Sequence, residues 1–202
     1  MTATTMLVVR HATPTLLAVG SLPEVDNERG LSAEGHRAAA DLAVRLHMAP
    51  ITAIYSSPYR RAIETIEPLA ARLKLRVRVR DDLAERWLAD RILEEEEWLD
   101  AYRRTWDDID FRPQGGEARR TTQDRAHAAL ADFRRQHAGE TVVVSSHGGL
   151  IGCLLRAMDE DMTFERALEM PMPALFELTD ETGEWRISTG DLRHLSRGVF
   201  PN

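Results

Sequence analysis

Two short apolar runs constrain this chain most, TMLVVR at residues 5–10 and TVVVSS at residues 141–146. Neither run alternates polar with apolar side chains, so each would present apolar groups on both faces of a sheet. A strand of this kind is buried on both sides, as at the centre of a parallel sheet covered by helices. We therefore expect both segments to be central strands of an α/β protein.

Amphipathic helices and strands alternate along the rest of the chain. Apolar residues recur at helical spacing, and Ser32 and Pro58 are of types that favour helix starts. The predicted helices are 33–48, one that begins at Pro58, 92–108, 117–137 and a short one after 148. The further predicted strands are 51–57, 75–80 and a terminal hairpin of 174–180 and 184–189. Pro68, inside the second helix, predicts a kink or an early break.

This order of elements indicates one α/β domain over residues 1–202. We expect a three-layer sandwich, in which a mostly parallel central sheet has helices on both faces.

The overall composition is that of a globular protein with an acidic balance. Of the 202 residues, 43% are hydrophobic and 29% charged, and the formal net charge is -7. This charge disfavours general nucleic-acid binding, and no run of 18 apolar residues suggests a membrane span. The single cysteine, Cys153, lies in an apolar run and is expected to be buried. Because neither a disulfide framework nor a signal peptide is evident, we expect a cytoplasmic location.

Charged residues follow the predicted strands at the point where each strand ends. Arg10 and His11 come at the end of the first strand, His147 follows the strand at 141–146, and the segment SSPYRRAIET follows the strand at 51–57. Ligands of open α/β sheets bind at the carboxyl ends of the strands. The sequence therefore predicts that two histidines and two arginines approach one edge of the sheet.

These segments resemble the motifs of the histidine phosphatase superfamily, which includes the cofactor-dependent phosphoglycerate mutases. LVVRHATPT resembles its Arg-His-Gly signature, and VVVSSHGGL its second histidine block. The other similar segments, in chain order, are NERGLSAEGHRAA, SSPYRRAIET, LAERWLAD (83–90) and PQGGEAR (113–119). The similarity runs in order from residue 6 to about residue 155, and it implies the phosphoglycerate mutase-like fold.

The resemblance also implies a role for each of five residues. His11 would be the nucleophile that takes the phosphoryl group, and Arg10 would bind the phosphate oxygens beside it. Arg61 would be the second phosphate clamp, and His147 would hydrogen-bond the phosphoryl group. Glu85 would be the proton donor to the leaving oxygen.

The chemistry of phosphoryl transfer fits these residue types. Negative charge spreads over the phosphoryl oxygens in the transition state, and fixed guanidinium groups stabilise it. A neutral imidazole is a competent nucleophile, so the reaction can proceed in two steps through a phosphohistidine. Because the arginines supply positive charge and no metal-binding motif is present, we expect neither a metal nor another cofactor.

Several positions depart from the family pattern or have alternative interpretations. Ala12 stands where the family usually has glycine, and Ala118 where it has serine. TPTLLAVG, after the first motif, lacks the family's phosphate-binding asparagine. Alternatives to Glu85 are Asp81, Asp82 and Asp90. The histidines expected to be solvated are His36, His47, His127, His137 and His194.

The favoured function is hydrolysis of a small phosphorylated metabolite through a phosphohistidine. The alternatives are a phosphoglycerate-type mutase, a phosphohistidine protein phosphatase and a catalytically silent protein that binds a phosphorylated ligand. Residues 86–116, rich in tryptophan and placed between two motifs, are expected to form a lid that sets specificity. The sequence leaves the substrate and the oligomeric state open.

Overall fold

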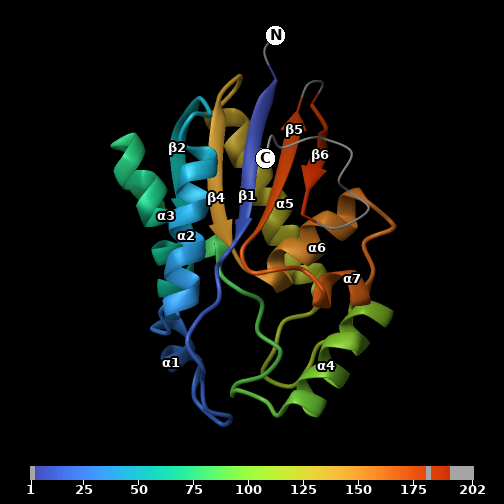
Figure 1. Ribbon diagram of the computed structural model, residues 1–202. Coiled ribbons are helices and arrows are strands. Elements are labelled where there is room, and N and C mark those ends of the chain that lie inside the picture. Colours follow the sequence, from blue (N-terminus) through green and yellow to red (C-terminus); the bar gives the residue numbers. More distant parts are fainter. Residues whose placement is uncertain (1–2, 181–182, 192–202) are drawn as a thin grey trace.

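A six-stranded sheet forms the centre of the protein, in a computed structural model that describes residues 3–180 and 183–191 (Figure 1). The strands lie in the order β3-β2-β4-β1-β5-β6. The first four are parallel, β5 is antiparallel to β1, and β6 is antiparallel to β5. Their bounds are β1 Thr4–Arg10, β2 Ile51–Ser56, β3 Val77–Val79, β4 Thr141–Ser146, β5 Ala174–Asp180 and β6 Trp185–Gly190. The mostly parallel sheet and the terminal hairpin are confirmed.

Helices cover both faces of this sheet. In Figure 1, α2 and α3 lie on one side of the strands, and α5 and α6 on the other. The helices are α1 Pro23–Asn27, α2 Ala33–Leu46, α3 Arg60–Leu73, α4 Glu95–Asp107, α5 Arg119–Gln136, α6 Gly148–Met158 and α7 Phe164–Leu168, with a 3-10 turn at Asp81–Leu83. None of the helices in the described ranges is both long and apolar enough to cross a membrane.

The central strands contribute side chains to two separate apolar clusters, which explains their unbroken apolar sequence. Met6 and Val8 of β1 pack in the cluster on the α5 and α6 side. Leu7 and Val9 pack in the cluster on the α2 and α3 side. Successive side chains of a strand point to opposite faces, so a strand between two helical layers needs apolar residues at every position.

The connections that follow β1 and β4 diverge to opposite faces of the sheet, which leaves a crevice at the carboxyl ends of these strands. The chain passes from β1 towards α2 on one face and from β4 directly into α6 on the other (Figure 1). The two strands are neighbours, and Arg10 lies opposite Ser146 in the register. Two neighbouring strands whose connections diverge leave space for a ligand where they end.

Of the kink or early break expected at Pro68, the early break is wrong, because α3 continues through Pro68 to Leu73. A proline inside a helix costs about 3 kcal/mol, through one lost hydrogen bond and a clash with the preceding turn. Leu69 and Ala70, directly after it, are buried in the α2 and α3 cluster. Their burial offsets that cost and keeps the last turn helical.

Other differences from the sequence expectations are local. The strand expected at 75–80 is only Val77–Val79, at the edge of the sheet. His137 is buried rather than solvated, because its ring lies 2.9 Å from the Tyr55 hydroxyl and 2.7 Å from the Glu140 carboxylate. His194 lies outside the described residues, whereas Cys153 is buried as expected.

Gly35→Ala should destabilise the protein by about 1–3 kcal/mol, because there is no room for a methyl group at this position. A Cβ on Gly35 would lie 2.1 Å from the Thr13 backbone oxygen. The matched control is Gly152→Ala in α6, where the nearest atom, Cβ of Ala167, would be 3.4 Å away. Denaturant unfolding of both variants measures the difference, and equal stabilities would contradict this account of the α2 start.

Candidate active site

The two predicted histidines come together at the carboxyl ends of β1 and β4. His11 follows β1 and donates its backbone N–H to Ser146 of β4 at 3.0 Å. His147 follows β4 directly, and the centroids of the two imidazole rings are 5.1 Å apart. Both rings are buried, with 5% of His11 and none of His147 exposed. The parallel pairing of two central strands thus places the two rings next to each other, although His147 is not among the residues that line the cavity with His11.

The surroundings of His11 keep its ring neutral. Its Nδ1 lies 2.8 Å from the Ala12 carbonyl oxygen, so this nitrogen carries the hydrogen and donates it. Nε2 then has the lone pair, and the Nε–H of Arg61 donates to it at 3.3 Å. Burial, and then the charge of Arg61, lower the pKa of His11 well below 6.5. A lone pair on Nε2 is the form that a nucleophilic imidazole requires.

Arg61 is fixed by a residue that the sequence reasoning missed. Its two terminal nitrogens donate to the Asp26 backbone oxygen at 2.8 Å and to the Asp26 carboxylate at 2.9 Å. Arg29 pairs with the other oxygen of the same carboxylate at 3.0 Å. A buried guanidinium needs such a partner to remain charged without a large penalty. No local pattern marks Asp26, because it precedes Arg61 by 35 residues.

Arg10 lies on the other side of the strand pair and is only partly satisfied. One terminal nitrogen donates to the Met170 carbonyl oxygen. Its Nε is buried and has no hydrogen-bond partner among the described residues. Burial lowers the pKa of Arg10, and the Glu85 carboxylate acts against this shift. An N–H left without an acceptor beside a cavity is suited to receive an anion.

Glu85 is held at the N-terminus of α6. Its carboxylate accepts hydrogen bonds from the backbone N–H groups of Gly149 and Leu150, both at 3.1 Å, and of Arg86 at 2.8 Å. The helix dipole also favours a negative charge there. Of its three rivals, Asp81 is exposed, Asp82 pairs with Arg80 and Asp90 borders another cavity. Glu85 is the candidate that lines the cavity with His11.

Gly148 and Gly149 allow these side chains to approach the helix start. A Cβ on Gly148 would lie 3.1 Å from the Arg10 guanidinium carbon, and one on Gly149 would lie 2.5 Å from a Glu85 carboxylate oxygen. Neither glycine has a positive φ. The sequence requires glycine here for close approach rather than for an unusual turn.

His147 lies within hydrogen-bond distance of Ser57, a residue of the motif SSPYRR that the sequence analysis had singled out. The Ser57 hydroxyl lies 2.7 Å from its Nε2, and its Nδ1 is buried without a partner among the described residues. Burial, and then the charge of Arg61, lower the pKa of His147 well below 6.5. The Tyr59 ring packs against it with the centroids 4.8 Å apart. His147 is therefore a fixed, neutral ring.

Ala12 fits its position although the family pattern has glycine there. It is fully buried in a small cluster with Leu31 and Ala39. Its backbone N–H donates to the Thr65 hydroxyl at 2.9 Å, and its φ is not positive. The extra methyl group is thus accommodated without backbone strain.

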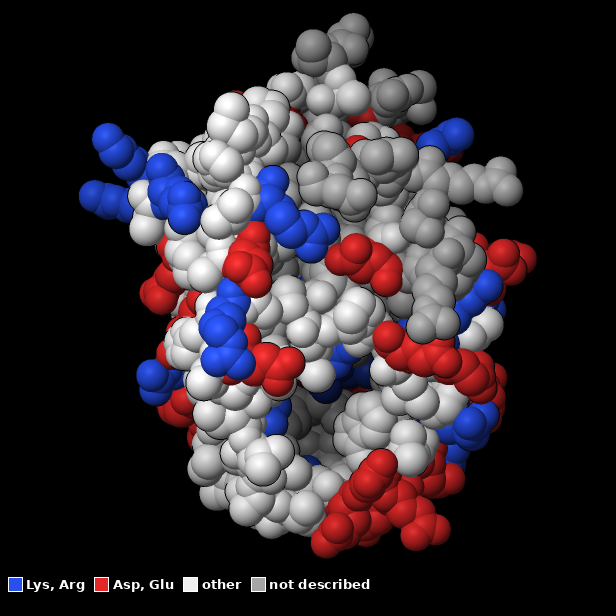
Figure 2. Space-filling view, in the orientation of Figure 1, with Lys and Arg blue, Asp and Glu red and all other residues white. Residues whose placement is uncertain are grey.

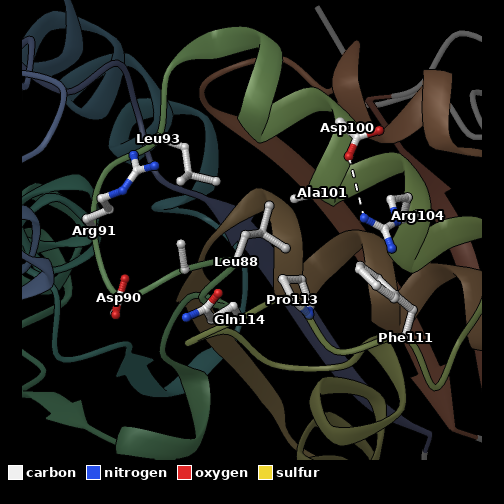
Figure 3. Close-up of a pocket in the computed structure, with 11 residues that line it drawn as sticks. Leu88, Asp90, Arg91, Leu93, Asp100, Ala101, Arg104, Phe111, Pro113 and Gln114 are labelled. Carbon is white, nitrogen blue, oxygen red and sulfur yellow. Dashed lines mark ion pairs between the residues drawn. The ribbon is translucent and has the colours of Figure 1, made fainter.

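A cavity of about 540 Å³ opens above these residues, lined by His11, Arg10, Arg61 and Glu85 and by parts of 14–19 and 86–98. Figure 2 shows a hollow between the elements at this end, with Lys and Arg at its walls and acidic side chains beside it, over the start of α4. A second cavity of about 330 Å³ lies next to it, against α4 (Figure 3). In the described ranges, no group of three or more His, Cys, Asp or Glu residues is arranged to hold a metal ion.

Comparison with known proteins identifies the class of this protein. The model of the histidine phosphatase superfamily (branch 1) matches residues 6–191, and the chain belongs to this superfamily. It is accordingly an enzyme of the phosphatase type, and the resemblance of its motifs is confirmed.

Individual relatives are similar over most of their length. The chain is 34% identical to phosphoglycerate mutase-like protein 4 of Arabidopsis thaliana, over 84% of this chain and 78% of that protein. It is 27% identical to a metal-independent phosphoserine phosphatase of the same plant, over 98% and 85%. The structure of a mycobacterial glucosyl-3-phosphoglycerate phosphatase superposes with a TM-score of 0.75 at 26% identity, covering 92% and 97% of the two chains.

The buried neutral histidines should make stability fall as the pH drops below about 6.5. The unfolded chain protonates both rings there, whereas the folded chain resists because the pKa of each ring is lowered well below 6.5. The free energy of unfolding should fall by up to about 1.4 kcal/mol per pH unit for each ring. Denaturant unfolding of the wild type and of His147→Gln between pH 7 and pH 5 measures this pH dependence. Identical slopes of the free energy of unfolding against pH would contradict the burial of a neutral His147.

Gly149→Ala should lower the turnover number by roughly 100-fold, because the added methyl group displaces the Glu85 carboxylate from α6. The Gly152→Ala variant of the same helix should retain turnover. Steady-state kinetics with an aryl phosphate compares the two variants. Full activity of Gly149→Ala would show that the reaction does not depend on the position of the Glu85 carboxylate.

Proposed function

We propose that the protein hydrolyses a small phosphomonoester through a phosphohistidine at His11. The observation that carries this proposal is the position of His11, whose Nε2 lies 3.3 Å from Nε of the buried Arg61 in a cavity that both residues line. A nucleophile beside a fixed cation can receive a phosphoryl group and stabilise the charge that develops on its oxygens.

The first step would transfer the phosphoryl group to the protein. Nε2 of His11 attacks phosphorus, the bond from phosphorus to the ester oxygen breaks, and Glu85 in its protonated form gives that oxygen a proton. Arg10 and Arg61 bind the phosphoryl oxygens, and His147 hydrogen-bonds the same group. The alcohol then leaves through the cavity.

The second step would release inorganic phosphate. The Glu85 carboxylate takes a proton from a water molecule, which attacks phosphorus while the bond to Nε2 breaks. The Nδ1–H of His11 keeps its bond to the Ala12 oxygen throughout, so the ring returns to its starting tautomer. The hydrogen bonds from α6 hold the Glu85 carboxylate in position for this second step.

Residues 86–116 are suited to the role of a lid over this reaction. The backbone of Ile92 exchanges two hydrogen bonds of 2.9 Å with Gly20 and Ser21, which joins this segment to the loop after β1. Trp87 and Trp98 line the cavity, whereas Trp106 packs against the Tyr102 ring. A site roofed from two sides favours a small molecule over a phosphorylated protein side chain.

The names of the relatives support a phosphatase and provide a second candidate. A phosphoserine phosphatase and a glucosyl-3-phosphoglycerate phosphatase are among them. The relative at 34% identity is called phosphoglycerate mutase-like, so transfer of the phosphoryl group to a second hydroxyl is the alternative.

His11→Ala should lower hydrolysis of p-nitrophenyl phosphate at least about 1,000-fold, because it removes the nucleophile. Arg61→Ala should lower it roughly 100-fold or more. The matched control is Arg60→Ala, since Arg60 is exposed and pairs with Glu64. Acid quenching during turnover should trap phosphate on the wild type and not on His11→Ala.

The same panel separates the alternatives. Undiminished turnover by His11→Ala would refute the phosphohistidine mechanism. Isomerisation of phosphoglycerate that depends on 2,3-bisphosphoglycerate and exceeds hydrolysis would assign the protein as a mutase instead.

A further inference from the structure

Exposed apolar side chains gather on the chain between β1 and α2. We call residues 16–25 the apolar loop, because four large apolar residues in it are at least half exposed: Leu16, Val19, Leu22 and Val25. The other large apolar side chains that are exposed within the described ranges are spread over several elements: Val44, Met48, Val79, Trp98, Leu168 and Met172. Single exposed apolar residues are normal, whereas a patch of them marks a surface that binds a ligand or a partner.

The apolar loop is continuous with the lining of the catalytic cavity. Leu17 and Val19 line the cavity that also contains His11. Trp98 of α4 and Met172, which precedes β5, extend this apolar lining from other parts of the chain. Figure 1 shows the loop after β1 at the same end of the molecule as α4, and in Figure 2 the surface below and to the left of the hollow is largely white. A group that extends from His11 towards solvent therefore meets apolar side chains.

The charges around the cavity differ between its buried and its exposed lining. Burial, and then the charges of Arg61, Arg10 and Arg29, lower the pKa of His11, so these cations act at the nucleophile. The exposed start of α4 carries four glutamates at 94–97, one of which lines the cavity, and Figure 2 shows acidic side chains there beside the hollow. The buried end therefore attracts a phosphoryl group, whereas the exposed end repels an anionic leaving group.

Backbone hydrogen bonds hold the apolar loop in this position. The N–H of Thr15 donates to the Gly30 oxygen, that of Gly20 to the Ile92 oxygen and that of Ile92 to the Ser21 oxygen, each at 2.9 Å. These bonds do not use the apolar side chains, which stay exposed on a backbone that is bonded to two other segments. Their contact with water is unfavourable, and a ligand with apolar surface would remove it.

We propose that the apolar loop binds the hydrocarbon part of an amphiphilic phosphomonoester, such as an alkyl phosphate. This inference rests on the proposed phosphatase function and narrows its substrates to esters with an apolar, uncharged leaving group. The two steps given above would then release an alkanol and inorganic phosphate. A polyhydroxylated leaving group would lose hydrogen bonds to water against this loop, which offers it few polar side chains. The cavity of about 540 Å³ is within the range of roughly 300–1,000 Å³ that is usual for small-molecule sites.

A series of n-alkyl phosphates tests the proposal. From ethyl through butyl to hexyl phosphate, the kcat/KM of the wild type should rise about 2- to 4-fold per methylene group, mainly through KM, because each methylene buries apolar surface. Propyl phosphate should exceed glycerol 3-phosphate, which carries two additional hydroxyl groups, by at least about 10-fold in kcat/KM. A kcat/KM that does not depend on chain length would overturn the proposal.

Two valines of equal exposure provide a matched pair of variants. Val19 is 50% exposed and lines the cavity, whereas Val44 of α2 is 51% exposed and does not line it. The ratio of hexyl to ethyl phosphate in kcat/KM should fall at least about 5-fold when Leu17→Ser and Val19→Ser are combined, and it should stay within about 2-fold in Val44→Ser. Thermal unfolding checks that each variant is folded. An equal loss of kcat/KM for all chain lengths would make these side chains structural and would overturn the proposal.

Binding of n-alkyl phosphonates to the wild type gives the same comparison without turnover, and it decides if the serine variants fail to fold. Hexyl phosphonate should bind at least about 10-fold more tightly than ethyl phosphonate in calorimetry. Equal binding of the two phosphonates would overturn the role of the apolar loop.

The outcomes separate this inference from the proposed function. Hydrolysis of p-nitrophenyl phosphate without any dependence on alkyl chain length would overturn the role of the apolar loop and leave the phosphatase intact. Phosphonate binding that strengthens with chain length, in a protein that hydrolyses no ester, would refute the proposed function and support the loop as an apolar binding site. If Val19→Ser converts a dimer into a monomer in sedimentation analysis and leaves the hexyl to ethyl ratio unchanged, the loop is an interface between two copies, which overturns the proposal.

Discussion

The parallel pairing of β1 with β4 is the interaction on which the site depends. It places Arg10 opposite Ser146, and one further hydrogen bond, from His11 to Ser146, carries the pairing past the end of β1. The two histidines therefore follow neighbouring strands at the same level, although 136 positions separate them in the sequence. The apolar residues of both strands are buried between two helical layers, so the core that stabilises the fold also fixes the distance between the rings.

The electrostatics of the site follow from how each charge is buried. Arg61 is paired with Asp26, and the Glu85 side chain accepts hydrogen bonds from the start of α6, so each has partners within the protein. The histidines have no such acid and stay neutral. Arg10 and Arg86 have buried N–H groups without acceptors among residues 3–180 and 183–191. A bound anion would supply acceptors for these N–H groups, in a protein whose net charge is -7.

Sequence reasoning located the residues that follow strands and missed those that act through long-range contacts. His11, His147 and Glu85 stand in recognisable motifs, and the alternation of helices with strands indicated the sheet on which they meet. Asp26 gave no comparable signal, since an aspartate in a polar segment usually faces solvent. His137 was misjudged for the same reason, because its partner Tyr55 is 82 residues away. Pro68 shows the opposite error, in which a local preference was outweighed by burial in the core.

The contacts of residues 85–88 fix the backbone of this stretch beside the cavity. Glu85 is tied to the first turn of α6, and Trp87 accepts a hydrogen bond of 2.7 Å from the Glu117 N–H at the base of α5. Gly116 packs so closely on the Leu88 backbone that a Cβ there would lie 2.7 Å from it. The stretch 85–88 is therefore held by the start of α6 and by the turn before α5, while Arg86 also stacks on Tyr102 of α4. Because these contacts involve its backbone and Glu85, a change of another side chain in this stretch would leave the position of its backbone unaltered.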